Sequence, residues 1–130
     1  MHTEANKEAF KTAYYESRNG ANAFFKNPLY PDFLYSDGVR ALAHTGCYWL
    51  LGILCTELPG EFKKRSGEYL CVVTITVKDN VANIVGQWSD DDETSWTKQI
   101  GFTDLPEGEW KLFVSDNGEL QLICILPSEY

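Results

Sequence analysis

The sequence predicts an α+β fold with two N-terminal helices packed on a five-stranded antiparallel meander sheet. Apolar residues recur at helical spacing up to residue 58, whereas beyond residue 69 they alternate at every second position. The strand-like segments are short and are joined by short turns, as in an antiparallel meander. Because the helices precede the strands and do not alternate with them, the class is α+β. We expect residues 1–130 to form a single domain.

The first predicted helix spans residues 4–18. Phe10, Ala13 and Tyr14 recur there at helical spacing among residues that favour helix formation. The segment 21–35 contains two prolines, so we expect it to be an irregular loop. Its many aromatic residues indicate that this loop packs onto the rest of the protein.

The second predicted helix spans about residues 38–58. Ser36 or Asp37 is a suitable N-cap, and Pro59-Gly60 is expected to end the helix. The later turns are apolar nearly all round, which indicates a central position in the fold. The predicted core contains Leu42, Trp49, Leu50, Ile53, Val73, Ile75 and Leu122.

The second half of the chain has the alternation that is typical of strands. Cys71, Val73 and Ile75 fall on one face of the first strand, with threonines between them. A turn is indicated at Asp79-Asn80, because both residue types tolerate left-handed backbone conformations. The five expected strands span residues 69–78, 82–88, 96–102, 109–114 and 119–126.

Charge is distributed unevenly along the chain. Up to Lys78 there are eight acidic and nine basic residues, whereas from Asp79 onward eleven acidic residues accompany two lysines. The net charge of −8 therefore belongs to the C-terminal half. A negative field of this kind repels nucleic acid and attracts basic proteins. We expect a protein partner with a basic surface and no direct contact with nucleic acid, and a homodimer is left open.

The densest acidic run, from Asp90 to Glu93, is the centre of the candidate partner-binding surface. Trp88 and Trp96 flank this run, and a large aromatic side chain beside charge is typical of an interface anchor. The run lacks the alternating ligands and the glycine of a calcium-binding loop. A solvated hairpin tip that keeps the protein soluble is the alternative. The candidate partner-binding residues are Asp90, Asp91, Asp92, Glu93, Trp96, Glu107, Glu109 and Asp116.

The four cysteines are expected to be reduced, buried thiols. None belongs to a Cys-x-x-Cys motif and all have apolar neighbours, so no metal site and no cofactor is predicted. His44 and Cys47 stand three residues apart on the second predicted helix, where a Cys–His pair could form a thiolate nucleophile. A small enzyme using this pair is therefore an alternative, although the sequence supplies no orienting acid and no oxyanion donors.

Export and membrane insertion are not expected. The first residues are polar and charged, without the apolar segment of a signal peptide behind them. The longest apolar stretch, from Cys47 to Cys55, is about half as long as a segment that crosses a bilayer. We therefore expect a cytoplasmic protein that does not associate with membranes.

Several segments resemble one uncharacterised family of small bacterial, plasmid and phage proteins. Leu34–Val39 is similar to the family's Tyr-Thr-Asp-Gly-Val entry to a helix, and Gly46–Leu51 to its Gly-Ala-Tyr-Trp-Leu-Leu core. Phe102–Asp104 stands at its late Tyr-Thr-Asp turn, and Leu126–Tyr130 is similar to its terminal Leu-Pro-Ser-Glu-Tyr. Gly52 is a departure, because the resemblance implies an acidic residue at that position.

The resemblance implies a mobile genetic element as the setting, in which small acidic proteins often block host-defence proteins, and it implies no reaction. Together with the net charge, it favours a non-catalytic acidic domain that binds a protein. The specific form of this hypothesis is an anti-CRISPR-like inhibitor that occupies the basic groove of a host-defence nucleic-acid-binding protein. A structural homo-oligomer is a further alternative.

Overall fold

The computed structural model describes residues 4–16, 24–27, 30–45, 47–64, 68–88, 95–101, 103, 105–116 and 121–129. Its helices are α1 (Glu4–Glu16), α2 (Asp37–His44), α3 (Tyr48–Lys63) and the short 3₁₀ helix η2 (Pro127–Glu129). Its strands are β1 (Phe24–Asn27), β2 (Tyr30–Ser36), β3 (Leu70–Lys78), β4 (Val81–Gln87), β5 (Trp96–Ile100), β6 (Gly108–Asp116) and β7 (Leu122–Ile125).

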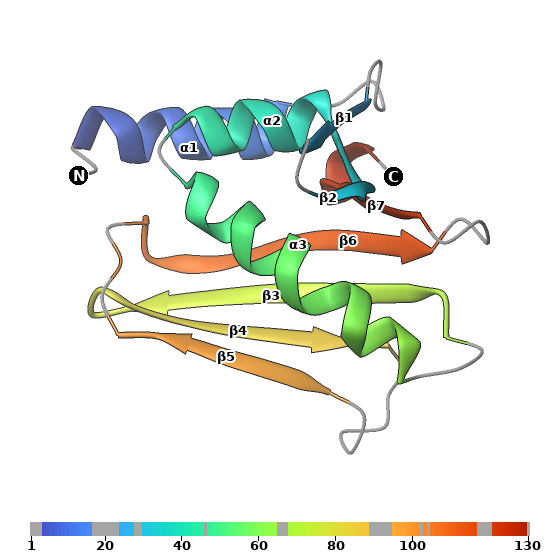
Figure 1. Cartoon of the computed structure of the whole chain (residues 1–130). Coiled ribbons are helices and arrows are strands. Elements are labelled where there is room, and N and C mark those ends of the chain that lie inside the picture. The colour runs from blue at the N-terminus through green and yellow to red at the C-terminus, as the bar shows by residue number, and fades with distance from the viewer. Residues whose placement is uncertain are drawn as a thin grey trace.

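The α-helices lie against one face of a single mixed sheet (Figure 1). α3 crosses in front of the central strands, while α1 and α2 lie side by side above β6. The strand order is β1-β2-β7-β6-β3-β4-β5. The predicted α+β class is confirmed. The predicted numbers of helices and strands are wrong, because the described residues form three α-helices and seven strands instead of two helices and five strands.

The sheet is a meander in part of its width. β3, β4 and β5 are antiparallel neighbours, and the turn between β3 and β4 holds Asp79 and Asn80 at φ 53° and 64°, as the turn prediction requires. β6 then pairs with the other side of β3, and β7 pairs antiparallel with β6 and parallel with β2. The prediction of an entirely antiparallel sheet is therefore wrong.

The segment 21–35 was expected to be irregular, but its described part forms the hairpin of β1 and β2. Pro31 is tolerated because it lies beside an irregularity of the hairpin, where the pairing shifts between Lys26 and Asn27. The pairing of β2 with β7 begins beyond this proline, at Phe33. The ladder of hydrogen bonds therefore does not need the N–H that proline lacks.

The single helix predicted for residues 38–58 is two helices, because the chain turns between His44 and Tyr48. Thr45 N and Thr45 Oγ1 both donate to the carbonyl of Leu42, at 3.1 and 2.7 Å. Cys47 Sγ donates to the same carbonyl at 3.3 Å. These bonds satisfy the Leu42 carbonyl near the end of α2 and redirect the chain into α3.

Pro59 lies inside α3 and does not end it, contrary to the prediction. A proline in a helix interior removes one hydrogen bond and costs ~3 kcal/mol. Burial of Leu58 and Phe62 on either side of Pro59 offsets this cost, so the helix continues to Lys63. Among the described residues, no helix is long and apolar enough to span a membrane.

The hydrophobic core lies between the helices and the sheet. Of the predicted core, Leu42, Leu50, Val73, Ile75 and Leu122 are buried, as expected. Trp49 and Ile53 are partly buried and pack against the edge of this core. α3 is therefore less central on that side than its composition indicates.

α1 covers an edge of the sheet beside which no described strand lies. β7 pairs with the residues of β6 from Phe113 to Asp116, which leaves the first half of β6 without a neighbour on that side. There, the backbone N–H of Lys111 donates to Tyr14 Oη at 2.9 Å, and Phe10 packs edge-on against Trp110. The helix thus supplies a hydrogen-bond acceptor for a backbone N–H of this edge strand.

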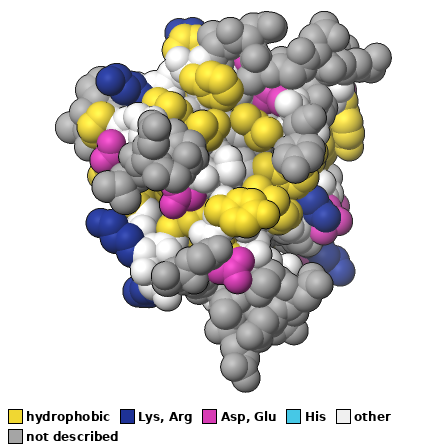
Figure 2. Space-filling view, turned by 90° about the vertical axis from the view of Figure 1, so that its right-hand side faces the viewer, with side chains coloured by type: hydrophobic (Ala, Val, Ile, Leu, Met, Phe, Trp, Pro, Cys, Tyr) yellow, Lys and Arg dark blue, Asp and Glu magenta, His cyan; other side chains and the backbone are white. Residues whose placement is uncertain are grey.

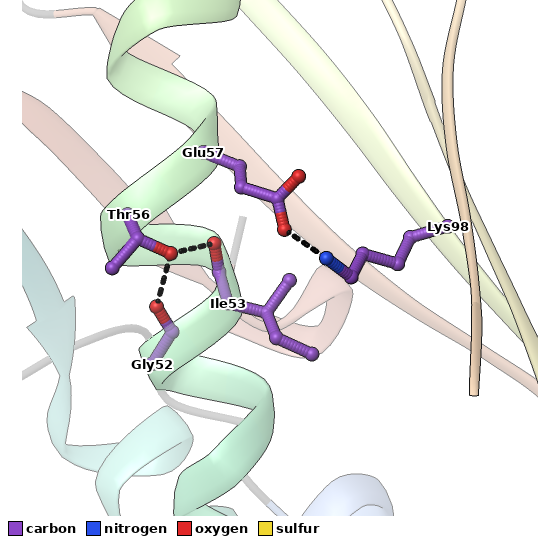
Figure 3. Close-up of polar contacts among 5 residues, drawn as sticks. All are labelled: Gly52, Ile53, Thr56, Glu57 and Lys98. Carbon is purple, nitrogen blue, oxygen red and sulfur yellow. Dashed lines mark hydrogen bonds and ion pairs between the residues drawn. The ribbon is translucent and has the colours of Figure 1, made fainter.

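α3 contacts β5 through an ion pair between Glu57 Oε2 and Lys98 Nζ at 2.7 Å (Figure 3). Thr56, the residue before Glu57, donates from its Oγ1 to the carbonyl of Gly52 at 2.9 Å. A Cβ built on Gly52 meets no heavy atom within 4 Å outside its own helix backbone. Packing therefore does not require glycine at this position.

Replacing Gly52 with alanine should stabilise the protein by ~0.5–1 kcal/mol, because alanine favours the helix and the added methyl group meets no neighbour. The same change at Gly86 should destabilise the protein by ~1–3 kcal/mol, because its Cβ would lie 3.0 Å from Cys71 Sγ. Urea unfolding measures both changes. A lower free energy of unfolding for Gly52→Ala would contradict the placement of this residue in α3.

Candidate protein-binding surface

Two of the predicted acidic residues gather with a third at one end of the sheet. The backbone N–H of Asp79, in the turn after β3, donates to Glu107 Oε1 at 3.1 Å. Glu109 follows in β6, where it lies opposite Thr76 of β3. Asp79, Glu107 and Glu109 are all exposed. We refer to these three residues as the acidic end.

An exposed tyrosine lies close to the acidic end. Tyr15 is 59% exposed and packs edge-on against Tyr14, with 5.1 Å between the ring centroids. Tyr14 in turn packs edge-on against Trp110 of β6 at the same distance. Burial raises the pKa of Tyr14, the hydrogen bond from the Lys111 backbone lowers it, and the charges of Tyr15 and Glu109 raise it. Glu109 is the residue before Trp110 in β6. Tyrosine next to carboxylates is a composition typical of interface anchors.

The remaining predicted acids do not join this group. Asp116 is at the opposite end of β6, seven residues from Glu109 and therefore roughly 24 Å away along the strand. The run from Asp90 to Glu93 lies outside the described residues. Its described neighbours, Trp88 and Ser95, are at the end of the sheet where β4 ends and β5 begins. The eight predicted residues therefore do not form one continuous surface in the described structure.

The prediction of Trp96 as an exposed anchor is wrong. Trp96 is 8% exposed and Trp88 is 7% exposed. Trp96 pairs with Gly86 of β4, and the missing side chain of this glycine leaves space for the indole ring. Trp88 packs edge-on against Phe62 of α3, with 5.3 Å between the ring centroids. Both indoles therefore belong to the core between α3 and the sheet.

The predicted pair of His44 and Cys47 does not form. His44 is exposed at the end of α2, and its Nδ1 lies 2.7 Å from the hydroxyl of Tyr48. Cys47 is buried and donates to the carbonyl of Leu42 instead. The turn between α2 and α3 separates the two side chains, which a continuous helix would have brought together. The geometry therefore does not support a Cys–His nucleophile.

All four cysteines are free thiols and all are buried, as predicted. Burial raises the pKa of Cys47 to about 12 and that of Cys55 to about 11. Burial also raises the pKa of Cys124. Protonated thiols are poor nucleophiles and poor metal ligands. Within the described ranges, no group of three or more His, Cys, Asp or Glu residues is placed to hold a metal ion.

Sequence analysis missed a buried polar cluster that joins α2 to the C-terminal segment. Ser36 Oγ donates to Glu129 Oε1 at 2.5 Å and accepts from the backbone N–H of Val39 at 3.1 Å. The backbone N–H groups of Gly38 and Leu126 also donate to the Glu129 carboxylate, at 3.2 and 2.9 Å. Glu129 is 8% exposed, so these three donors replace the water that it loses.

This cluster joins two distant sequence motifs. Ser36, one of the two predicted N-cap candidates, is the N-cap of α2, and the Glu129 carboxylate lies at the positive end of that helix. The two residues are 93 positions apart, so helix-cap signals alone could not pair them. The usable signal was the presence of Ser36 and Glu129 in two of the segments that carry the family resemblance.

Comparison with known proteins agrees with that resemblance. Residues 11–130 match the sequence model of a family described as "Family of unknown function (DUF6876)". The chain belongs to this family. The matched range includes Ser36, Glu129 and the acidic end. No curated protein and no solved structure matches the chain.

Replacing Ser36 with alanine should lower the free energy of unfolding by ~1–3 kcal/mol. The change removes the N-cap of α2 and leaves the buried Glu129 carboxylate without one of its donors. Thr56→Ala is the control, because the exposed Thr56 hydroxyl bonds to carbonyls of its own helix and its loss should cost less than ~0.5 kcal/mol. Equal urea midpoints for the two variants would contradict the role of the cluster.

The folded protein should resist alkylation by iodoacetamide at pH 8. With the pKa of Cys47 raised to about 12, only about one thiol in 10⁴ is ionised at that pH, and the thiolate is the reactive form. All four cysteines should react after denaturation in guanidinium chloride. Mass spectrometry counts the adducts in both states, and rapid labelling of Cys47 in the folded protein would show that its thiol is accessible and activated.

Proposed function

We propose that this chain is a non-catalytic protein-binding domain, and that the acidic end together with Tyr15 binds a partner with a basic surface. The observation that carries the proposal is the exposed Tyr15 packed on Tyr14, whose hydroxyl accepts from the backbone N–H of Lys111, two residues after Glu109 in β6. An aromatic anchor with a charged rim is a common arrangement at protein interfaces. Tyr15 thereby takes the role that sequence analysis assigned to Trp96.

The net charge of the whole chain supports the same proposal. Lys78 adjoins Asp79 in the chain and offsets part of the negative charge of the acidic end. The attraction for a basic partner therefore comes from the net charge of −8 as well as from the three residues of the acidic end. Exposed charges at the rim of an interface act mainly on the association rate. Their effect declines as salt shortens the Debye length to ~8 Å near physiological ionic strength.

In its specific form, the proposal is that the partner is a nucleic-acid-binding protein of host defence, and that the chain is an anti-CRISPR-like inhibitor from a phage or another mobile element. A protein with a net charge of −8 has the same sign of charge as nucleic acid and can compete for a basic groove. Such a partner would place the chain in the cytoplasm.

The test is a kinetic measurement with charge-reversed variants. A tagged protein captures the partner from host lysate, mass spectrometry identifies it, and surface plasmon resonance then measures binding of the purified partner at two salt concentrations. Asp79→Lys with Glu109→Lys should lower the association rate about tenfold or more at low salt, with a smaller effect at high salt. Tyr15→Ala should mainly raise the dissociation rate.

The control is Asp116→Lys with Glu68→Lys, which makes the same change in net charge at the other end of the sheet. It should lower the association rate less than the reversal at the acidic end. Thermal unfolding of each variant checks that the fold is retained. Equal association rates for both double variants, or salt-independent binding by the wild type, would refute the acidic end as the recognition surface.

A further inference from the structure

The face of the sheet opposite the helices has the composition of a buried surface. In β7, Leu122 and Cys124 are buried on the side of the helices, while Ile123 and Ile125 lie on the other face and are partly exposed. A sheet with one face in water usually alternates apolar and polar residues, whereas strands that are apolar on both faces are typical of sheets covered on both sides. β7 has the second pattern.

Strand register extends this apolar surface across neighbouring strands. Ile125 lies opposite Phe113 of β6, and Phe113 lies opposite Val72 of β3. In adjacent rows, Ile123 and Leu70 both lie opposite Ser115, and Val85 of β4 lies opposite Thr74. All of the apolar residues in these rows are partly exposed. The apolar face is defined by Leu70, Val72, Val85, Phe113, Ile123 and Ile125.

The part of the chain that the structure describes places its three α-helices on the opposite side of the sheet (Figure 1). The apolar face reaches the end of the molecule where β6 ends and β3 begins. Tyr69, which precedes Leu70, is 71% exposed. Figure 2 shows this end, with hydrophobic side chains gathered across its middle and charged side chains around them.

Charge favours a second copy of this chain as the occupant of the apolar face. The described charged residues on the helix-free side of the strands are three lysines and two acids, in a chain whose net charge is −8. Two copies therefore repel each other least when these sides meet. A basic partner, in contrast, meets more lysines than acids on this side. The charged residues on the helix-free side are Lys26, Asp32, Lys78, Glu109 and Lys111.

The size of the helix-free side is suitable for a dimer. The strands range from four residues in β1 and β7 to nine in β3 and β6. At ~3.4 Å by ~4.8 Å per residue, all seven strands together cover roughly 700 Å². This area is close to the ~800 Å² that each partner buries in a stable interface.

We infer that two copies of this chain form a twofold-symmetric dimer through their apolar faces, with two sheets stacked face to face. A twofold interface uses the same patch on both subunits, so one apolar face supplies both halves of the contact. Stacked sheets lie ~10 Å apart, with the side chains of the two inner faces interdigitated. The apolar face contains no residue of the acidic end, but Glu109 lies on the same side of the sheet, so the salt dependence of binding is what separates this inference from the proposed function.

The test is sedimentation velocity on the purified wild-type chain and two variants. The wild type should sediment as a species with twice the 14.8 kDa mass of one chain. Val72→Glu should weaken dimerisation at least tenfold, because each buried carboxylate would meet the apolar face of the other copy. Ala41→Glu is the matched control, since it adds the same charge at an exposed position of α2 and should leave the dimer intact.

Val72→Thr keeps a β-branched side chain and serves as the second variant if Val72→Glu fails to fold. It should weaken the dimer less than the carboxylate does. Circular dichroism of each variant checks the fold. A wild type that is still monomeric at roughly 100 μM would overturn the inference. A Val72 variant that dimerises as tightly as the wild type would also overturn it.

Salt separates this inference from the proposed function. Dimerisation should strengthen as salt rises, because salt screens the repulsion between two chains of charge −8. Binding of a basic partner should weaken under the same change. A dimer that dissociates as salt rises would overturn the apolar face as its interface and would leave the partner experiment unaffected.

Discussion

The rest of the structure depends on the hydrogen bonds of the Glu129 carboxylate. This group ties the N-terminus of α2, through Ser36 and Gly38, to the end of the chain that follows β7. The same region contains the parallel pairing of β2 and β7, which joins the β1–β2 hairpin to the sheet. Because an unpaired carboxylate is costly to bury, the cluster forms fully only when both the start of α2 and the segment after β7 are in place. The N-cap residue of α2 therefore also forms a contact between segments that are far apart in the sequence.

Periodicity was sufficient to predict the elements that depend on local sequence. The strands from β3 to β6 and the Asp79-Asn80 turn follow from alternation and turn chemistry. The break between α2 and α3 was missed because Thr45 and Cys47 form it with bonds to one carbonyl, while the apolar pattern continues across the turn. Pro59 was misinterpreted because burial of its neighbours outweighs the cost of a proline in a helix.

The sequence predicted which kinds of residue form the candidate site, acidic residues beside an aromatic side chain, but not where all of them lie in the fold. Glu107 and Glu109 do lie with Asp79, because β6 returns antiparallel beside β3. The aromatic partner could not be identified, since the choice between Trp96 and Tyr15 depends on which rings the sheet buries. Trp96 is covered because Gly86 opposite it lacks a side chain, and cross-strand pairs of this kind appear only when the register is known.

The position of β7 has a consequence for biosynthesis. This strand is the last of the described strands, yet it lies between β2 and β6 in the sheet. During synthesis, β2 therefore lacks β7 as its neighbour until residues 122–125 leave the ribosome, and α2 lacks the carboxylate at its N-terminus until Glu129 follows. Pairings this distant in sequence form slowly, because the loop must close before the contact stabilises it. The nascent chain is thus exposed to chaperones and proteases until β7 and Glu129 have emerged.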